Sequence, residues 1–221
     1  MPLPRPFLAP LLAAGLALVG CGGGGAPPLS LSLLPRAGEE SVRMFGGWAG
    51  PALVALGPSG YCTERMASRP AEGYAAFVGC GRLTGATLGA GSDAFVSLQA
   101  GGRGSAAVAG NEAALATLLA TPEGGAMLSS DGNPVVTDSI EESPGLVIVR
   151  FHGRRSPDGR ESAEWRAFLD LSGRLTTVSV RGFVRGGLEV EAGRGVLMAT
   201  VTRLRQANTV SGGLVAEQFA G

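Results

Sequence analysis

SAEWRAFLDLSGRLTTVSVRGFV, residues 162–184, carries the strongest fold signal in the chain. Polar and apolar residues alternate on both sides of Ser172-Gly173, the pattern of two antiparallel strands that each bury one face. A two-residue turn at Ser172-Gly173 would join strands over 162–171 and 174–184 and set their register. In this register one face carries the apolar side chains of Trp165, Ala167, Leu169, Val178 and Val180. The opposite face carries the charged side chains of Glu164, Arg166 and Asp170. A slip of one residue would bury these charges, so the register is well specified.

Five shorter apolar runs predict further strands around this hairpin. LVIVRFH (146–152) precedes it directly, and AFVSLQA (94–100) lies further upstream. We expect 94–100 to form a hairpin with SAAVA (105–109), because glycines lie between the two runs. ALVAL (52–56) is expected to pair with AAFVGC (75–80).

Two segments change to the helical period. One follows Asn111, a favoured N-cap residue, and ends at Pro122. Its expected buried face consists of Leu115, Leu118 and Leu119. The other covers 191–208 and is amphipathic. Its expected buried face consists of Leu197, Val201, Leu204 and Ala207.

The order strands, helix, strands, helix predicts an α+β fold: an antiparallel sheet with one or two helices packed on it as an α/β sandwich. This order of elements resembles the layout of PsbP/Mog1-type domains over about 170 residues, without a diagnostic motif. We expect a single domain over 41–208 and a loose C-terminal tail over 209–221.

The N-terminal residues form a separate signal. Arg5 is followed by thirteen apolar or small residues, Phe7–Val19. This run is shorter than the roughly 20 residues needed to span a bilayer, and it fits the apolar part of a secretory signal peptide. It ends in Leu18-Val19-Gly20-Cys21, which resembles the lipobox of bacterial lipoproteins.

The resemblance implies that residues 1–20 are removed and that the Cys21 thiol and new amino group are acylated. Several acyl chains would anchor the protein stably to the bilayer. Residues 21–40, which begin with four glycines after Cys21, read as a flexible tether. Aspartate after the lipid cysteine tends to retain lipoproteins at the inner membrane. Gly22 occupies that position here, so the resemblance implies the periplasmic face of an outer membrane.

Composition excludes several function classes. The chain has 18 basic and 18 acidic residues and a formal net charge of zero, so nucleic acid is not an expected partner. Every basic residue is arginine. Chemistry that depends on a lysine, such as a Schiff base or a phosphate-loop lysine, is therefore excluded.

Cys62 and Cys80 remain after Cys21 is assigned to the lipid. An even pair in an exported protein predicts a structural disulfide, which would staple the domain. Two free thiols or a redox-switching pair are the alternatives, although the spacing is not C-x-x-C.

No assembled active site is evident. His152 is the only histidine, no G-x-S-x-G motif accompanies it, and too few ligands remain for zinc. We expect His152 to be a surface residue near a hairpin turn. Neither a metal nor another cofactor is expected.

The sequence therefore favours a non-catalytic, lipid-anchored envelope protein that contacts another envelope protein or peptidoglycan. The candidate contact is the arginine-rich loop with Arg154, Arg155 and Arg160. The alternative is a small envelope hydrolase or ligand-binding module that uses His152 with Asp158 or Asp170.

Overall fold

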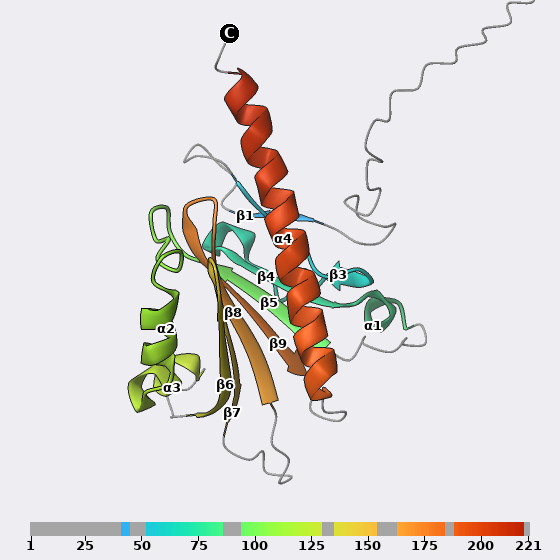
Figure 1. Ribbon diagram of the computed structural model, residues 1–221. Helices are drawn as coiled ribbons and strands as arrows, with labels where there is room; N and C mark the ends of the chain where they lie inside the picture. Colours follow the sequence, from blue (N-terminus) through green and yellow to red (C-terminus); the bar gives the residue numbers. More distant parts are fainter. Residues whose placement is uncertain are drawn as a thin grey trace, which may run out of the picture. The chain divides into compact units, whose positions relative to one another are not determined.

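The computed structural model describes residues 41–44, 52–85, 94–129, 135–153, 163–183 and 188–218. These residues form a seven-stranded antiparallel sheet and a separate two-stranded sheet (Figure 1). The large sheet contains, in spatial order, β3 (Tyr61–Thr63), β4 (Tyr74–Gly79), β5 (Ala94–Ala100), β9 (Arg174–Gly182), β8 (Ala163–Leu171), β7 (Leu146–His152) and β6 (Val136–Ser143). The small sheet pairs β1 (Val42–Met44) with β2 (Leu53–Ala55). The α+β class predicted from the sequence is confirmed.

The β8–β9 hairpin has the register expected from its sequence. Leu171 lies opposite Arg174, and Trp165 lies opposite Val180. Ser172 and Gly173 have φ angles of 52° and 71°, the left-handed conformation that a two-residue type I′ turn requires at both positions. The apolar face of the hairpin is buried, including Ala167, Leu169, Val178 and Val180 at 0% exposure.

Helix α4 (Val190–Gln218) covers this apolar face and contacts β8 and β9 (Figure 1). Leu197, Val201 and Leu204 project into the main core as expected, whereas Ala207 is half-buried. The expected end at residue 208 is wrong, because α4 is helical through Gln218 and includes most of the predicted tail.

Gly193 allows the first turn of α4 to approach the sheet. A Cβ atom at this position would lie 2.7 Å from Trp165 Cδ1, so only glycine fits without a rearrangement. The indole N–H of Trp165 donates to the Val190 carbonyl at 3.1 Å, which satisfies its polar group in the core.

The opposite face of the sheet is covered over β6 and β7 by α2 (Glu112–Leu119), which is followed by α3 (Pro122–Leu128). A second core forms here from the buried residues Val108, Ala116, Leu119, Leu128, Val147, Val149 and Phe151. Of the helix face that we expected to be buried, Leu119 is buried and Leu115 half-buried, whereas Leu118 is 42% exposed.

Pro122 lies beyond the end of α2, as predicted, but it also begins α3. Proline suits the first turn of a helix because the N–H that it lacks would have no intrahelical partner. The Thr121 hydroxyl accepts the Gly124 N–H at 3.1 Å and caps the new helix.

Two predicted strand pairings are wrong. The run 52–56 contains β2, which pairs with β1 rather than with 75–80, and β4 pairs instead with β3. The run 105–109 is not a strand, since the neighbours of β5 are β4 and β9. The two remaining short elements are a 3-10 helix, η2 (Pro70–Glu72), and α1 (Cys80–Thr84).

Candidate functional site

Several predicted site residues lie outside the described part of the chain. They are Cys21 with the signal segment and tether, Asp158, and the loop residues Arg154, Arg155 and Arg160. The other candidates, Cys62, Cys80, His152 and Asp170, are all described.

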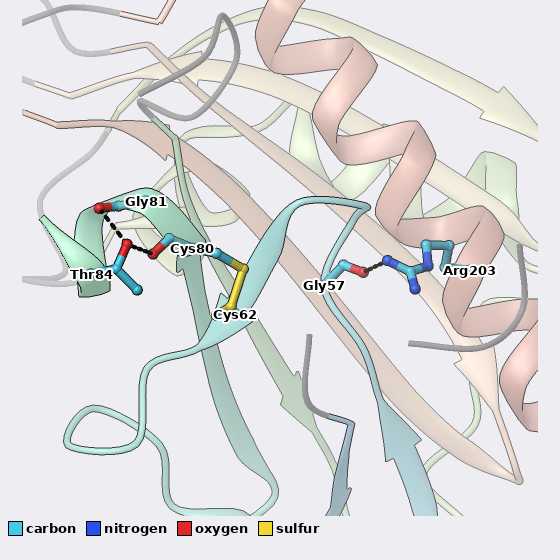
Figure 2. The surroundings of a disulfide bond; sticks show 6 residues. All are labelled: Gly57, Cys62, Cys80, Gly81, Thr84 and Arg203. Carbon is cyan, nitrogen blue, oxygen red and sulfur yellow. Dashed lines mark hydrogen bonds between the residues drawn. A yellow bond between two sulfur atoms is a disulfide. The ribbon is translucent and has the colours of Figure 1, made fainter. Parts of the chain in front are cut away.

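Cys62 and Cys80 form the predicted disulfide (Figure 2), with their Cα atoms 4.8 Å apart. Cys62 lies on edge strand β3, and Cys80 is the first residue of α1. The bond therefore ties the short edge strand to the helix that follows its neighbour β4.

Two further contacts stabilise the surroundings of the disulfide (Figure 2). The Thr84 hydroxyl lies 3.3 Å from the Cys80 carbonyl and 3.4 Å from that of Gly81, within the turn of α1. Arg203 of α4 donates to the Gly57 carbonyl at 2.9 Å, just before the chain enters β3. The edge carrying the disulfide is thereby connected to the long helix.

His152 ends β7 and belongs to a small charged cluster. Its Nδ1 lies 2.9 Å from Oδ1 of Asp138, and Nε of Arg150 lies 3.5 Å from Oδ2 of the same carboxylate. Asp138 occupies an irregularity in the β6–β7 ladder between Thr137 and Ser139. A bulge redirects a side chain in this way, and here it places the carboxylate between the imidazole of His152 and the guanidinium of Arg150.

Asp170 lies far from this cluster. His152 pairs with Ala163 at one end of β8, and Asp170 is seven positions further along that strand, about 23 Å at roughly 3.3 Å per residue. Hydrogen-bond reach is about 3 Å, so His152 and Asp170 cannot share an active site. This half of the hydrolase alternative is therefore wrong.

Asp170 instead organises the loop before α2. Its Oδ1 accepts the N–H of Ala107 at 3.0 Å, and its Oδ2 accepts those of Val108 and Ala109 at 2.9 Å each. Successive N–H groups of a strand point in opposite directions, so three in a row cannot converge on one carboxylate. This explains why 105–109 is a loop despite its apolar composition.

Arg166 also has a structural role on this face. Its Nη1 donates to the Leu128 carbonyl at the end of α3, and its Nε donates to the Ser179 hydroxyl, both at 2.8 Å. Burial lowers the pKa of the Arg166 guanidinium. We expected this face of β8 to carry its charges into solvent. Instead, Asp170 and Arg166 bind the loop before α2 and the end of α3.

Glu141 and Glu112 connect the β6–β7 hairpin to the helices. Glu141 forms a bidentate ion pair with Arg194 of α4, with N–O distances of 3.0 and 2.6 Å, and this hydrogen bonding lowers the pKa of its carboxyl. Glu112 of α2 accepts the Gly145 N–H at 2.6 Å, which lowers its pKa. Arg205 of α4 donates to the Gly145 carbonyl at 2.9 Å. The turn is therefore held from both faces of the sheet.

A part of the sheet beyond α2 and α3 carries a mixed arginine and aromatic surface, which we call the open sheet face. A hollow of about 610 Å³ lies there, lined by Ala67, Arg69, Glu72, Tyr74, Phe95, Gln99 and Arg181. Phe95 pairs with Arg181 on the face opposite to core residues Val96 and Leu98. This surface was not predicted from the sequence, although the alternation within 94–100 already places Phe95 away from the apolar core.

The described residues contain no group of three or more His, Cys, Asp or Glu side chains arranged to hold a metal ion. Within the same residues, no helix combines the length and apolar character needed to cross a membrane.

No protein-family model matches the chain, and no curated protein matches its sequence. Solved structures that are similar to it include two of Mog1. A point mutant of the protein Mog1 is 13% identical, with 78% of this chain and 94% of that chain covered and a TM-score of 0.40. The Saccharomyces cerevisiae Ran-binding protein Mog1p is 12% identical, with 78% and 93% covered and a TM-score of 0.41. Similarity at this level carries no conclusion about this chain.

Proposed function

We propose that this protein is a non-catalytic lipoprotein of a bacterial envelope. Acylated Cys21 anchors it at the periplasmic face of the outer membrane, and its folded domain binds an envelope protein. The observation that carries the proposal is Leu18-Val19-Gly20-Cys21 at the end of a short apolar segment. The Cys62–Cys80 disulfide supports it, because such bonds persist in oxidising compartments outside the cytosol.

The contact of His152 with Asp138 fits a structural role for this histidine. Its imidazole is paired with Asp138 at the edge of the sheet, and no hydroxyl or thiol of the described residues is hydrogen-bonded to it. We accordingly assign His152 a structural role with Asp138 and Arg150.

Intact-mass spectrometry of the membrane-extracted protein tests the anchor. We expect a chain that begins at Cys21 and carries three acyl chains, with a mass gain of two hydrogens when the disulfide is reduced. Cys21→Ser should abolish acylation and leave the disulfide intact. Cys80→Ser is the matched control, which should remain acylated.

An uncut signal segment, or a soluble protein with a free Cys21 thiol, would refute the proposal. Turnover of an envelope substrate by the purified domain, with loss of activity in His152→Ala, would establish the hydrolase alternative instead.

A further inference from the structure

The open sheet face arises from the unequal coverage of the sheet. Helices α2 and α3 pack over β6 and β7, while β4, β5 and β9 extend beyond them. The side chains of Arg69, Glu72, Gln99 and Arg181 are exposed there, and those of Tyr74 and Phe95 are half-buried. The segment that contains Ala67, Arg69 and Glu72 borders the strands, so the surface is recessed and holds the hollow described above.

Two arginines of this surface stack on aromatic rings. The guanidinium carbon of Arg181 lies 4.9 Å from the ring centroid of Phe95, and that of Arg82 lies 3.7 Å from the centroid of Phe183. The two rings meet edge to face, with centroids 6.3 Å apart. Stacking restricts the long arginine side chains before a partner binds, which reduces the entropy that binding must remove.

The charge of the surface is unbalanced although the chain as a whole is neutral. Among the described residues that line the hollow, Arg69 and Arg181 are accompanied by one acid, Glu72. Glu164, which lies opposite Arg181 in the β8–β9 pairing, is 3.7 Å from Arg166. The composition matches the centres of protein interfaces, where aromatic residues and arginine are enriched and acidic residues are depleted.

We propose that the open sheet face binds an acidic segment of a protein partner. The carboxylates of this segment pair with Arg69 and Arg181, while its apolar side chains contact Phe95 and Tyr74. The recessed shape favours a polypeptide segment over a bilayer, since a flat anionic surface could not enter the hollow. The proposal rests on the proposed function, which it deepens by specifying the docking surface and the chemistry of the partner.

This surface is tested by selecting binders from a displayed library of random peptides. Each peptide has about twelve residues and is about 40 Å long when extended. The bait is the acylated full chain in detergent. We expect enrichment of peptides rich in Asp and Glu, and synthetic copies of them should bind in a fluorescence-anisotropy titration. Binding should weaken as the ionic strength rises from about 0.01 M to about 0.15 M, because the Debye length falls from about 30 Å to about 8 Å.

Glutamine variants remove the charge and leave a shorter, neutral polar side chain. Arg69→Gln/Arg181→Gln should weaken binding of the selected peptides at least about tenfold. Arg43→Gln is the control, because it removes the charge of one arginine at an exposed position of β1, in the other sheet. Arg43→Gln should bind as the unchanged protein does. Equal thermal melting of the variants would establish that each is folded.

Enrichment without an acidic bias, or full binding by the double variant, would overturn the proposal. The proposal would also be overturned if no peptide bound and phosphatidylglycerol vesicles bound the unchanged protein but not the double variant. The arginines would then bind a membrane. A protein that lacks the acyl anchor yet selects acidic peptides would refute the lipoprotein and retain this surface. An anchored protein that selects no acidic peptides would refute this docking surface and retain the lipoprotein.

Discussion

Replacement of Asp170 by alanine tests how the loop before α2 is held. The substitution removes the acceptor of three consecutive backbone N–H groups, those of Ala107, Val108 and Ala109. Ala107 and Ala109 are exposed, so water can solvate their amides in the variant. The Val108 amide is partly buried, and its side chain is 0% exposed in the second core.

The magnitude follows from these environments. A hydrogen bond to a charged group contributes about 1.5–3 kcal/mol, and a buried donor left without an acceptor costs about 1–3 kcal/mol. Since water replaces the acceptor at two of the three amides, we expect Asp170→Ala to lower the free energy of unfolding by about 2–4 kcal/mol. Asp170→Asn retains one neutral acceptor oxygen and should lie between Ala and the unchanged protein.

Urea unfolding followed by the fluorescence of buried Trp165 measures this difference. Glu142→Ala is the matched control, because Glu142 is an exposed carboxylate on edge strand β6 and its removal should change stability by less than about 0.5 kcal/mol. Amide hydrogen exchange should also show that protection is lost at 107–109 in Asp170→Ala. If Asp170→Ala is as stable as Glu142→Ala, the carboxylate does not hold the loop, and the reasoning is refuted.

Three other changes probe different parts of the fold. Reduction of Cys62–Cys80, which are 18 positions apart, should lower the free energy of unfolding by about 3 kcal/mol in the chain-entropy model, as measured by urea unfolding with and without reductant. Gly193→Ala should destabilise the protein by about 1–3 kcal/mol, because its Cβ would overlap the indole ring of Trp165. Gly195→Ala has open space around it and should be neutral or stabilise by up to about 1 kcal/mol. A melting experiment that ranks the two variants the other way would contradict the packing of α4. The pKa of the Glu141 carboxyl is lowered by its partner Arg194. The ion pair therefore contributes stability above the unfolded pKa near 4.5, and this stability is lost as the pH falls through the lower folded pKa. Glu141→Gln should reduce this acid dependence of stability, and an unchanged pH profile would rule out the pair as its source.

The local signals in the sequence predicted their elements well. The turn at Ser172-Gly173 and the alternation on either side of it determine the β8–β9 register within one short segment, so no distant partner is needed. The core positions of α4 at Leu197, Val201 and Leu204 follow from the helical period in the same way. The even pair of cysteines left beside Cys21 predicted the disulfide, which the structure confirms.

Long-range pairing could not be predicted from the same signals. The strand in 52–56 is short and apolar, so its composition does not distinguish β1 from β4 as its partner. The loop at 105–109 has the composition of a strand, and only the carboxylate of Asp170, more than sixty positions away, orients its amides. The aromatic and arginine surface depends on Arg82, Phe95 and Arg181, which separate elements bring together.

The sequence by itself determined the β8–β9 hairpin, the buried face of α4, the pairing of the two cysteines and the motif at Cys21, because each depends on periodicity, spacing or residue counting along the chain. Only the tertiary structure decided that both faces of β8 are covered, that Asp170 and Arg166 bind backbone groups of the second layer, and that His152 pairs with Asp138. The physical reason is that a charged side chain on a strand has the same local pattern whether it meets water or a distant amide, and the packing of the helices determines which of the two it meets.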